Sequence, residues 1–130
     1  MFTVEGRPLL TGSAPCVDVT AAQTPVWVTA VNLGIVTPYS TGYCAPNDLI
    51  VRAEASKILA VYANTVTGTM NIISPSVQTF PDVLLAMWYF NYVESMYNGM
   101  GSIYAIAGNN FYPGDSLTTV DGQTWINNLP

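Results

Sequence analysis

The chain has 130 residues, enough for one domain with a sizeable core, and half of them are apolar. Charged residues make up only 8%, against about 25% in ordinary soluble domains, so the chain lacks the charged cover that keeps a free monomer soluble. The net charge is −5, and the only cations are Arg7, Arg52 and Lys57. These cannot neutralise the phosphates of a nucleic acid, so we expect no nucleic-acid partner.

Residues 1–25 are interrupted by prolines and a glycine, which predicts an extended N-terminal arm with one short strand over Cys16–Thr20. We expect the remainder, residues 26–130, to form a single β-rich domain. The stretch from Val26 to Val36 is rich in β-branched and aromatic residues. It therefore predicts a strand, with Gly34 as a bulge.

Residues 48–64 fit two patterns. Polar and apolar residues alternate from Val51 to Ser56, as in a strand, but a helical face is also formed by Val51, Ala55, Ile58 and Tyr62. The sequence favours two strands joined near Glu54–Lys57, and the choice between a hairpin and a helix stays open. Thr65–Ile73 alternates Thr and Asn with apolar residues, which predicts a strand with one wet face.

The strongest helix signal covers residues 81–98. Thr79 and Asp82 resemble a capping box, and Pro81 is tolerated in a first helical turn. One narrow polar stripe follows helical spacing, formed by Asn91, Glu94, Ser95 and Asn98. Nearly all the other residues are apolar, so we expect a largely buried helix with Trp88 inside, opposite the stripe.

The last part of the chain predicts more strands. Ile103–Ala107 suits a short buried strand, and residues 108–115 form a turn-rich loop. Residues 117–120 and 123–127 flank Asp121-Gly122, a strong hairpin signal. The predicted fold class is therefore α+β, mostly β: an antiparallel sheet or sandwich of short strands with one long helix over about 81–98.

The residue types argue against catalysis. The chain has no histidine, which excludes Ser-His-Asp and Cys-His mechanisms and removes the commonest metal ligand. The separation of Cys16 and Cys44 matches no usual zinc spacing, and the acids form no paired motif of the kind a glycosidase needs. We therefore expect no enzyme, no catalytic, cofactor-binding or metal residues, no cofactor and no small-molecule substrate.

Two binding features near residues 108–121 stay open. Oxygen ligands that calcium favours gather at Asn109, Asn110, Asp115 and Asp121, although turns attract the same residues. A sugar ring could stack on aromatic side chains, namely Tyr89, Tyr92, Tyr97, Tyr104, Phe111 and Tyr112. The sequence favours turns for the first group and core packing for the second, and it does not decide whether a calcium ion or a glycan binds there.

Targeting signals are also missing from the sequence. The longest apolar run, Val83–Phe90, is far shorter than the roughly 20 residues of a spanning helix, so we expect no membrane partner. Residues 1–5 lack the basic start and apolar stretch of a signal peptide, which indicates synthesis in the cytoplasm without one. Without an export signal, free buried thiols are favoured for Cys16 and Cys44.

The composition resembles that of virion proteins, particularly small shell, decoration or tail proteins of bacteriophages. The resemblance covers the whole chain and consists of low charge, abundant Thr, Val, Asn, Pro and Tyr, and an arm-like start. It implies a non-enzymatic capsid, decoration or tail subunit in the virion, working through contacts with other protein subunits in a homo- or hetero-oligomer. The alternative is a carbohydrate-binding β-sandwich module that uses exposed tyrosines.

Overall fold

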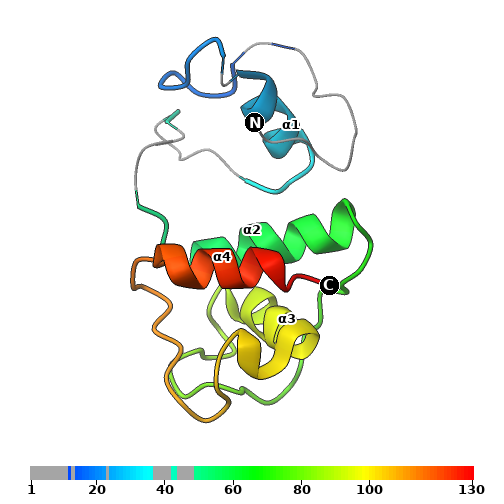
Figure 1. The fold of residues 1–130 in the computed structure, drawn as a ribbon, viewed down its shortest axis with the longest axis vertical. Helices are drawn as coiled ribbons and strands as arrows, with labels where there is room; N and C mark the ends of the chain where they lie inside the picture. The colour runs from blue at the N-terminus through cyan, green and yellow to red at the C-terminus, as the bar shows by residue number, and fades with distance from the viewer. Residues whose placement is uncertain (1–11, 13, 23, 37–41, 44–48) are drawn as a thin grey trace. The chain divides into compact units, whose positions relative to one another are not determined.

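The computed structural model describes residues 12, 14–22, 24–36, 42–43 and 49–130. These residues form four α-helices and no β-strand, with a single antiparallel bridge between Val51 and Ser116 (Figure 1). The predicted α+β, mostly β fold is therefore wrong, because the described part of the chain is helix-rich without a sheet. The chain divides into two compact units, Met1–Asp48 and Leu49–Pro130. Residues 1–11 and 13 of the expected arm lie outside the described residues.

The first unit contains α1, Thr24–Asn32, where a strand was expected. Its polar side chains bond within the helix, since the Thr29 hydroxyl donates to the Pro25 carbonyl (2.7 Å). Gly34 is not a bulge but ends the helix in the left-handed region at φ 72°. The Ile35 N–H then donates back to the Ala30 carbonyl (2.9 Å), in the pattern of a glycine-terminated helix.

The segment before α1 also differs from its prediction. Cys16–Thr20 forms bends and a turn instead of a strand. The Val17 N–H donates to the Gly42 carbonyl (3.1 Å). The free thiol expected at Cys16 is wrong as well, because Cys16 is buried and disulfide-bonded. Cys44 lies outside the described residues.

Of the stretch 48–64, the described residues 49–64 lie in the second unit and follow the helical alternative, so the favoured pair of strands is wrong. Helix α2, Arg52–Thr65, starts where the N–H groups of Arg52 and Ala53 donate to the carbonyls of Asp115 (2.9 Å) and Pro113 (3.0 Å). Its buried face consists of small residues, Ala53, Ala55, Ser56, Ala60 and Ala63. Small side chains let helices approach closely, and α2 packs against α3, Phe90–Met100.

The predicted helix over 81–98 is correct only in its second half. Thr79 and Asp82 do not cap a helix, because both side chains are engaged elsewhere: Thr79 donates to Glu94, and Asp82 accepts from the backbone of residues 111–112. Residues 80–89 instead form successive turns and bends before α3 begins. Trp88, expected inside, is 60% exposed.

The polar stripe of this helix is also not a wet face. Glu94 and Ser95 are buried within α3. Glu94 binds Thr79, and the Ser95 hydroxyl accepts the Ile73 N–H (2.8 Å). Glu94 and Ser95 are therefore part of the packed interior, where they bind two preceding segments of the chain, whereas Asn98 at the end of the stripe is exposed.

The predicted strand Ile103–Ala107 and the predicted hairpin near Asp121 are not strands either, and only Ile103 of the first region lies in a helix. Gly101–Ile103 forms a short 3-10 helix, η1, followed by a turn. The hairpin expected at Asp121-Gly122 is instead the first turn of α4, Thr119–Asn127. The Thr118 hydroxyl accepts the Asp121 N–H (3.0 Å), so Thr118 is the N-cap of α4. Asp121-Gly122 therefore lies in a helical turn and not in a β-turn.

Thr65–Ile73 is the last predicted strand, and it is chiefly extended chain without a strand partner. Its apolar residue Met70 is buried, and the Asn64 amide donates to the Met70 carbonyl (3.0 Å). Val66 and Met70 are buried, but Ile72 in the same alternation is exposed, so the pattern does not correspond to one buried side.

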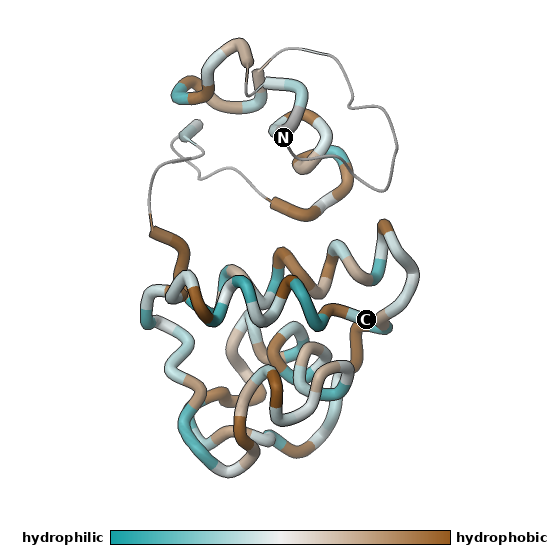
Figure 2. Tube along the Cα trace, in the orientation of Figure 1, coloured by the Kyte–Doolittle hydropathy of each residue, from teal (hydrophilic) through white to brown (hydrophobic). Residues whose placement is uncertain are grey.

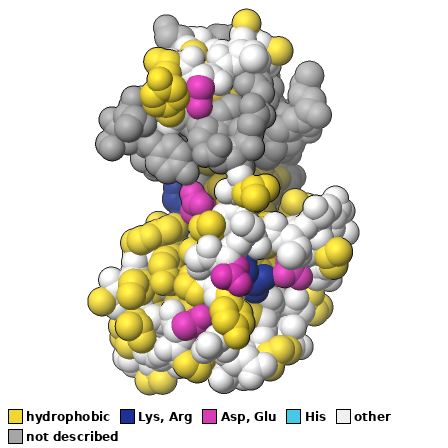
Figure 3. Space-filling view, turned by 90° about the vertical axis from the view of Figure 1, so that its left-hand side faces the viewer, with side chains coloured by type: hydrophobic (Ala, Val, Ile, Leu, Met, Phe, Trp, Pro, Cys, Tyr) yellow, Lys and Arg dark blue, Asp and Glu magenta, His cyan; other side chains and the backbone are white. Residues whose placement is uncertain are grey.

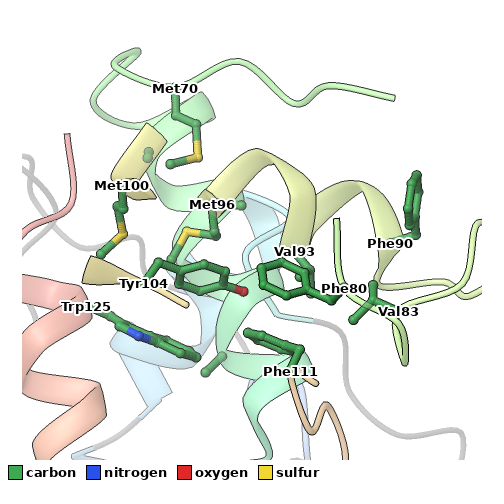
Figure 4. Packing of buried hydrophobic residues seen from close by; sticks show 13 residues of the cluster. Met70, Phe80, Val83, Phe90, Val93, Met96, Met100, Tyr104, Phe111 and Trp125 are labelled. Atoms are coloured by element: carbon green, nitrogen blue, oxygen red, sulfur yellow. The ribbon is translucent and has the colours of Figure 1, made fainter. Parts of the chain in front are cut away.

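One hydrophobic core organises the second unit. It is built from helices and loops alike, and hydrophobic stretches are visible in both along the tube of Figure 2. Rings form its centre, where the centroids of Tyr104 and Trp125 are 4.7 Å apart and those of Phe80 and Phe111 are 5.5 Å apart. In Figure 4, Val83 and Phe90 lie at one end of the core and Trp125 lies toward the other.

Candidate functional site

The charged side chains of residues 49–130 are used mostly to hold the fold together. Arg52 pairs with Asp121 across α2 and α4 (Nη1 to Oδ2, 2.7 Å), and its Nε donates to the Phe111 carbonyl (2.9 Å). Its guanidinium carbon also lies 4.7 Å from the ring centroid of Phe111 and 4.9 Å from that of Trp125. Arg52 therefore joins three segments by charge, hydrogen bonding and cation–π contact.

Two carboxylates act in the same structural way. Glu94 accepts the N–H (2.6 Å) and the hydroxyl (2.5 Å) of Thr79, which ties α3 to the segment before residue 80. Asp82 accepts the N–H groups of Phe111 and Tyr112, both at 2.7 Å. Both carboxylates thus hold distant segments of the chain together.

The closest pair of reactive side-chain types is Ser56 and Tyr104, whose oxygens are 2.5 Å apart in the core. The Ser56 hydroxyl also donates to the Arg52 carbonyl (2.8 Å), so Tyr104 is the donor between the two hydroxyls. Burial raises the pKa of the Tyr104 phenol well above its ordinary value, so this group stays neutral and cannot serve as a base. The pair is a structural hydrogen bond.

Among the residues that the structure describes, no buried side-chain nitrogen or oxygen lacks a hydrogen-bond partner. Within the same residues, no three Cys, Asp or Glu side chains gather where they could hold a metal ion. Of the four residues considered as calcium ligands, for which the sequence favoured turns, Asp121 is paired with Arg52, while Asn109, Asn110 and Asp115 are exposed around a turn.

The aromatic residues proposed as a sugar platform lie in different environments. Tyr104 and Phe111 are core residues. Tyr89, Tyr92 and Tyr97 are half-buried and pack against the core. Only Tyr112 is exposed among these six rings. Core packing, the explanation that the sequence favoured, accounts for most of the group.

The surface feature that sequence reasoning missed is a short apolar stretch ahead of α3. Four large side chains are exposed there, and we call them the 84–88 segment: Leu84, Leu85, Met87 and Trp88. The backbone beneath is fixed by buried anchors on both sides, Phe80, Val83 and Phe90. Hydrogen bonds close the turns, from Met87 N–H to the Leu84 carbonyl (3.0 Å) and from Phe90 N–H to the Met87 carbonyl (3.1 Å).

This segment is the best candidate for a functional site. An exposed large apolar patch is more informative than scattered exposed residues, because soluble monomers avoid such patches. Figure 3 shows hydrophobic side chains gathered along one side of the unit formed by residues 49–130. No sequence pattern separates these residues from core residues, since both are apolar and adjacent in the chain.

Comparison with known proteins adds no relative: no family model matches the chain, and no curated protein matches it. Over the part of the chain that is described, none of the helices has the length and apolar character needed to cross a membrane.

Proposed function

We propose that this chain is a non-enzymatic structural subunit of a large protein assembly, a capsid, decoration or tail protein of a bacteriophage-type virion. The observation that carries the proposal is the exposed 84–88 segment, in which four large apolar side chains stand on a fixed backbone. A binding role through protein–protein contacts follows from such a patch, because burying it against another subunit removes apolar area from water.

The use of charge supports the same role. Most charged side chains of residues 49–130 bind other parts of the chain: Arg52 with Asp121, Glu94 with Thr79, and Asp82 with the backbone at 111–112. Little charge is left to cover the surface of a protein with 8% charged residues. A subunit whose surface is packed against neighbouring subunits does not need charged surface residues to stay soluble.

The disulfide at Cys16 supports a location of the mature protein outside the reducing cytoplasm. Disulfides persist in oxidising surroundings, and the surface of a virion is one of them. A virion protein made in the cytoplasm would form this bond after assembly or release.

The proposal is tested by the native mass of the full-length protein. Sedimentation velocity over a wide range of concentration should show species of several times the 14.0 kDa monomer, and electron microscopy should show a particle of regular symmetry. Urea unfolding should also depend on protein concentration, since association is linked to folding. A stable monomer at high concentration, unfolding identically at every concentration, would show the proposed function to be wrong.

A further inference from the structure

The two units of the chain differ in the core that each one contains. In the unit Leu49–Pro130, thirteen buried residues form one hydrophobic cluster, and all of them lie between Ala55 and Trp125. Among the described residues of the unit Met1–Asp48, the buried hydrophobic side chains are Cys16, Val28, Ala30 and Ile35. A unit of fewer than about 70 residues seldom gains enough stability from its core alone, and such units commonly add a disulfide.

Helix α1 does not supply the missing stability by itself. It has nine residues, whereas isolated helices shorter than about 12–15 residues are marginal in water. Five of its nine residues are Thr or Val, and their β-branched side chains lower the helix propensity because they lose rotamer freedom in a helix. The helix therefore depends on restraints from the rest of its unit.

The disulfide of Cys16 is such a restraint. Cys16 is disulfide-bonded and 4% exposed. The one other cysteine of the chain is Cys44, so a bond within the chain closes a loop that contains α1. The Val17 N–H and the Gly42 carbonyl are joined (3.1 Å) near the two ends of the same loop. The unit Leu49–Pro130 contains no cysteine, so the crosslink acts within the first unit alone.

We propose that the unit Met1–Asp48 is a redox-sensitive element, which is folded while the Cys16 disulfide is intact and unfolds on reduction, whereas the unit Leu49–Pro130 keeps its fold. A crosslink between residues 16 and 44 shifts a folding equilibrium by roughly a few hundredfold, because it removes conformational entropy from the unfolded chain. A unit of this size has little stability to lose, so a change of that size is enough to unfold it.

The chemical step is the reduction of one disulfide by a thiol reductant. Two electrons and two protons from a dithiol convert the S–S bond into two thiols, and the dithiol becomes a cyclic disulfide. In a reducing compartment the first unit would stay unfolded, and it would fold when the chain enters an oxidising one. This inference goes beyond the proposed function and does not rest on it, because it concerns the fold of a single chain.

The test is hydrogen exchange of the full-length protein, read by mass spectrometry before and after treatment with dithiothreitol. The reporters are amides at the end of α1, where the Leu33 N–H donates to the Thr29 carbonyl (3.0 Å) and the Ile35 N–H to the Ala30 carbonyl (2.9 Å). Reduction should speed their exchange by about tenfold or more, and it should change exchange in α2 and α3 by less than about twofold.

The matched control is the double variant Cys16→Ala/Cys44→Ala. It should exchange like reduced wild type, and dithiothreitol should leave its exchange unchanged. Equal protection of α1 in oxidised and reduced wild type would overturn the inference, and so would an α1 that is unprotected in the oxidised protein. Loss of protection in α2 and α3 together with α1 would also overturn it, because the change would not be confined to the first unit. If the double variant cannot be produced, titration of wild type with dithiothreitol decides the result.

Discussion

Alanine substitution at two tryptophans should have very different effects on the free energy of unfolding. Trp125 is 1% exposed, and its ring centroid lies 4.7 Å from that of Tyr104 and 6.2 Å from that of Phe111. Replacing it with alanine removes buried apolar area and leaves a cavity between these rings. The expected loss for Trp125→Ala is about 3–5 kcal/mol.

The same change at Trp88 should cost less than about 1 kcal/mol. Trp88 is 60% exposed, and its ring packs edge-to-face against that of Tyr89, with the ring centroids 5.3 Å apart. The two variants should therefore differ by at least about 2 kcal/mol, which is roughly a 30-fold difference in the unfolding equilibrium.

Urea unfolding followed by far-UV circular dichroism measures both values. The experiment belongs at the lowest practical protein concentration, because a contact between copies at Trp88 would add a concentration-dependent term. Repeating it at higher concentration separates that term from the intrinsic stability. If Trp88→Ala costs as much as Trp125→Ala at low concentration, the assignment of inside and outside is wrong.

Three further outcomes are expected. Glu94→Ala leaves the part-buried N–H and hydroxyl of Thr79 without their acceptor and should lower the unfolding free energy by about 2–4 kcal/mol in urea titrations. A loss below about 0.5 kcal/mol would contradict the contact. Burial raises the folded-state pKa of Tyr104 above the ordinary 10.0, so the stability from its neutral phenol is complete below that pH and declines as the pH rises further. Wild type should therefore lose more unfolding free energy than Tyr104→Phe between about pH 8 and pH 11. Lys57, whose pKa is lowered by burial, titrates in both proteins and does not affect the comparison. Equal losses would refute the prediction. Because Cys16 is disulfide-bonded, mass spectrometry should show the unreduced chain lighter than the reduced chain by two hydrogens, and equal masses would exclude the bond.

The segment around residue 80 shows why local sequence patterns predicted the start of the helix incorrectly. Thr79, Pro81 and Asp82 have the spacing of a helix start, and the residues that follow have helical periodicity. In the structure, Asp82 binds the backbone at residues 111–112 and Thr79 binds Glu94. Such distant partners are invisible to a local pattern, so α3 begins at Phe90 and not at Pro81.

The Asp121-Gly122 pair shows the same limit for strands. The dipeptide favours a hairpin when strands flank it, but Thr118 caps a helix there and Asp121 pairs with Arg52, 69 positions away. In α1, β-branched residues occupy a helix although they favour strands. Tertiary contacts override such preferences, because the secondary-structure propensity of a single residue is weak.

The candidate surface was beyond prediction for a different reason. Apolar residues in sequence indicate burial, and nothing in the stretch from Leu84 to Trp88 shows that its large side chains are exposed. The composition did indicate a shortage of surface charge. The structure shows four large apolar side chains exposed together in the turns that precede α3.

The most direct test of the account is the oxidation of Trp88 by hydroxyl radicals, read by mass spectrometry at low and high protein concentration. If copies of the chain bind through the 84–88 segment, Trp88 should be modified strongly in dilute protein and protected by about tenfold when the protein is assembled. Trp125, at 1% exposure, should stay unmodified in both states and verifies that the fold is intact. Equal modification of Trp88 at all concentrations would contradict the account.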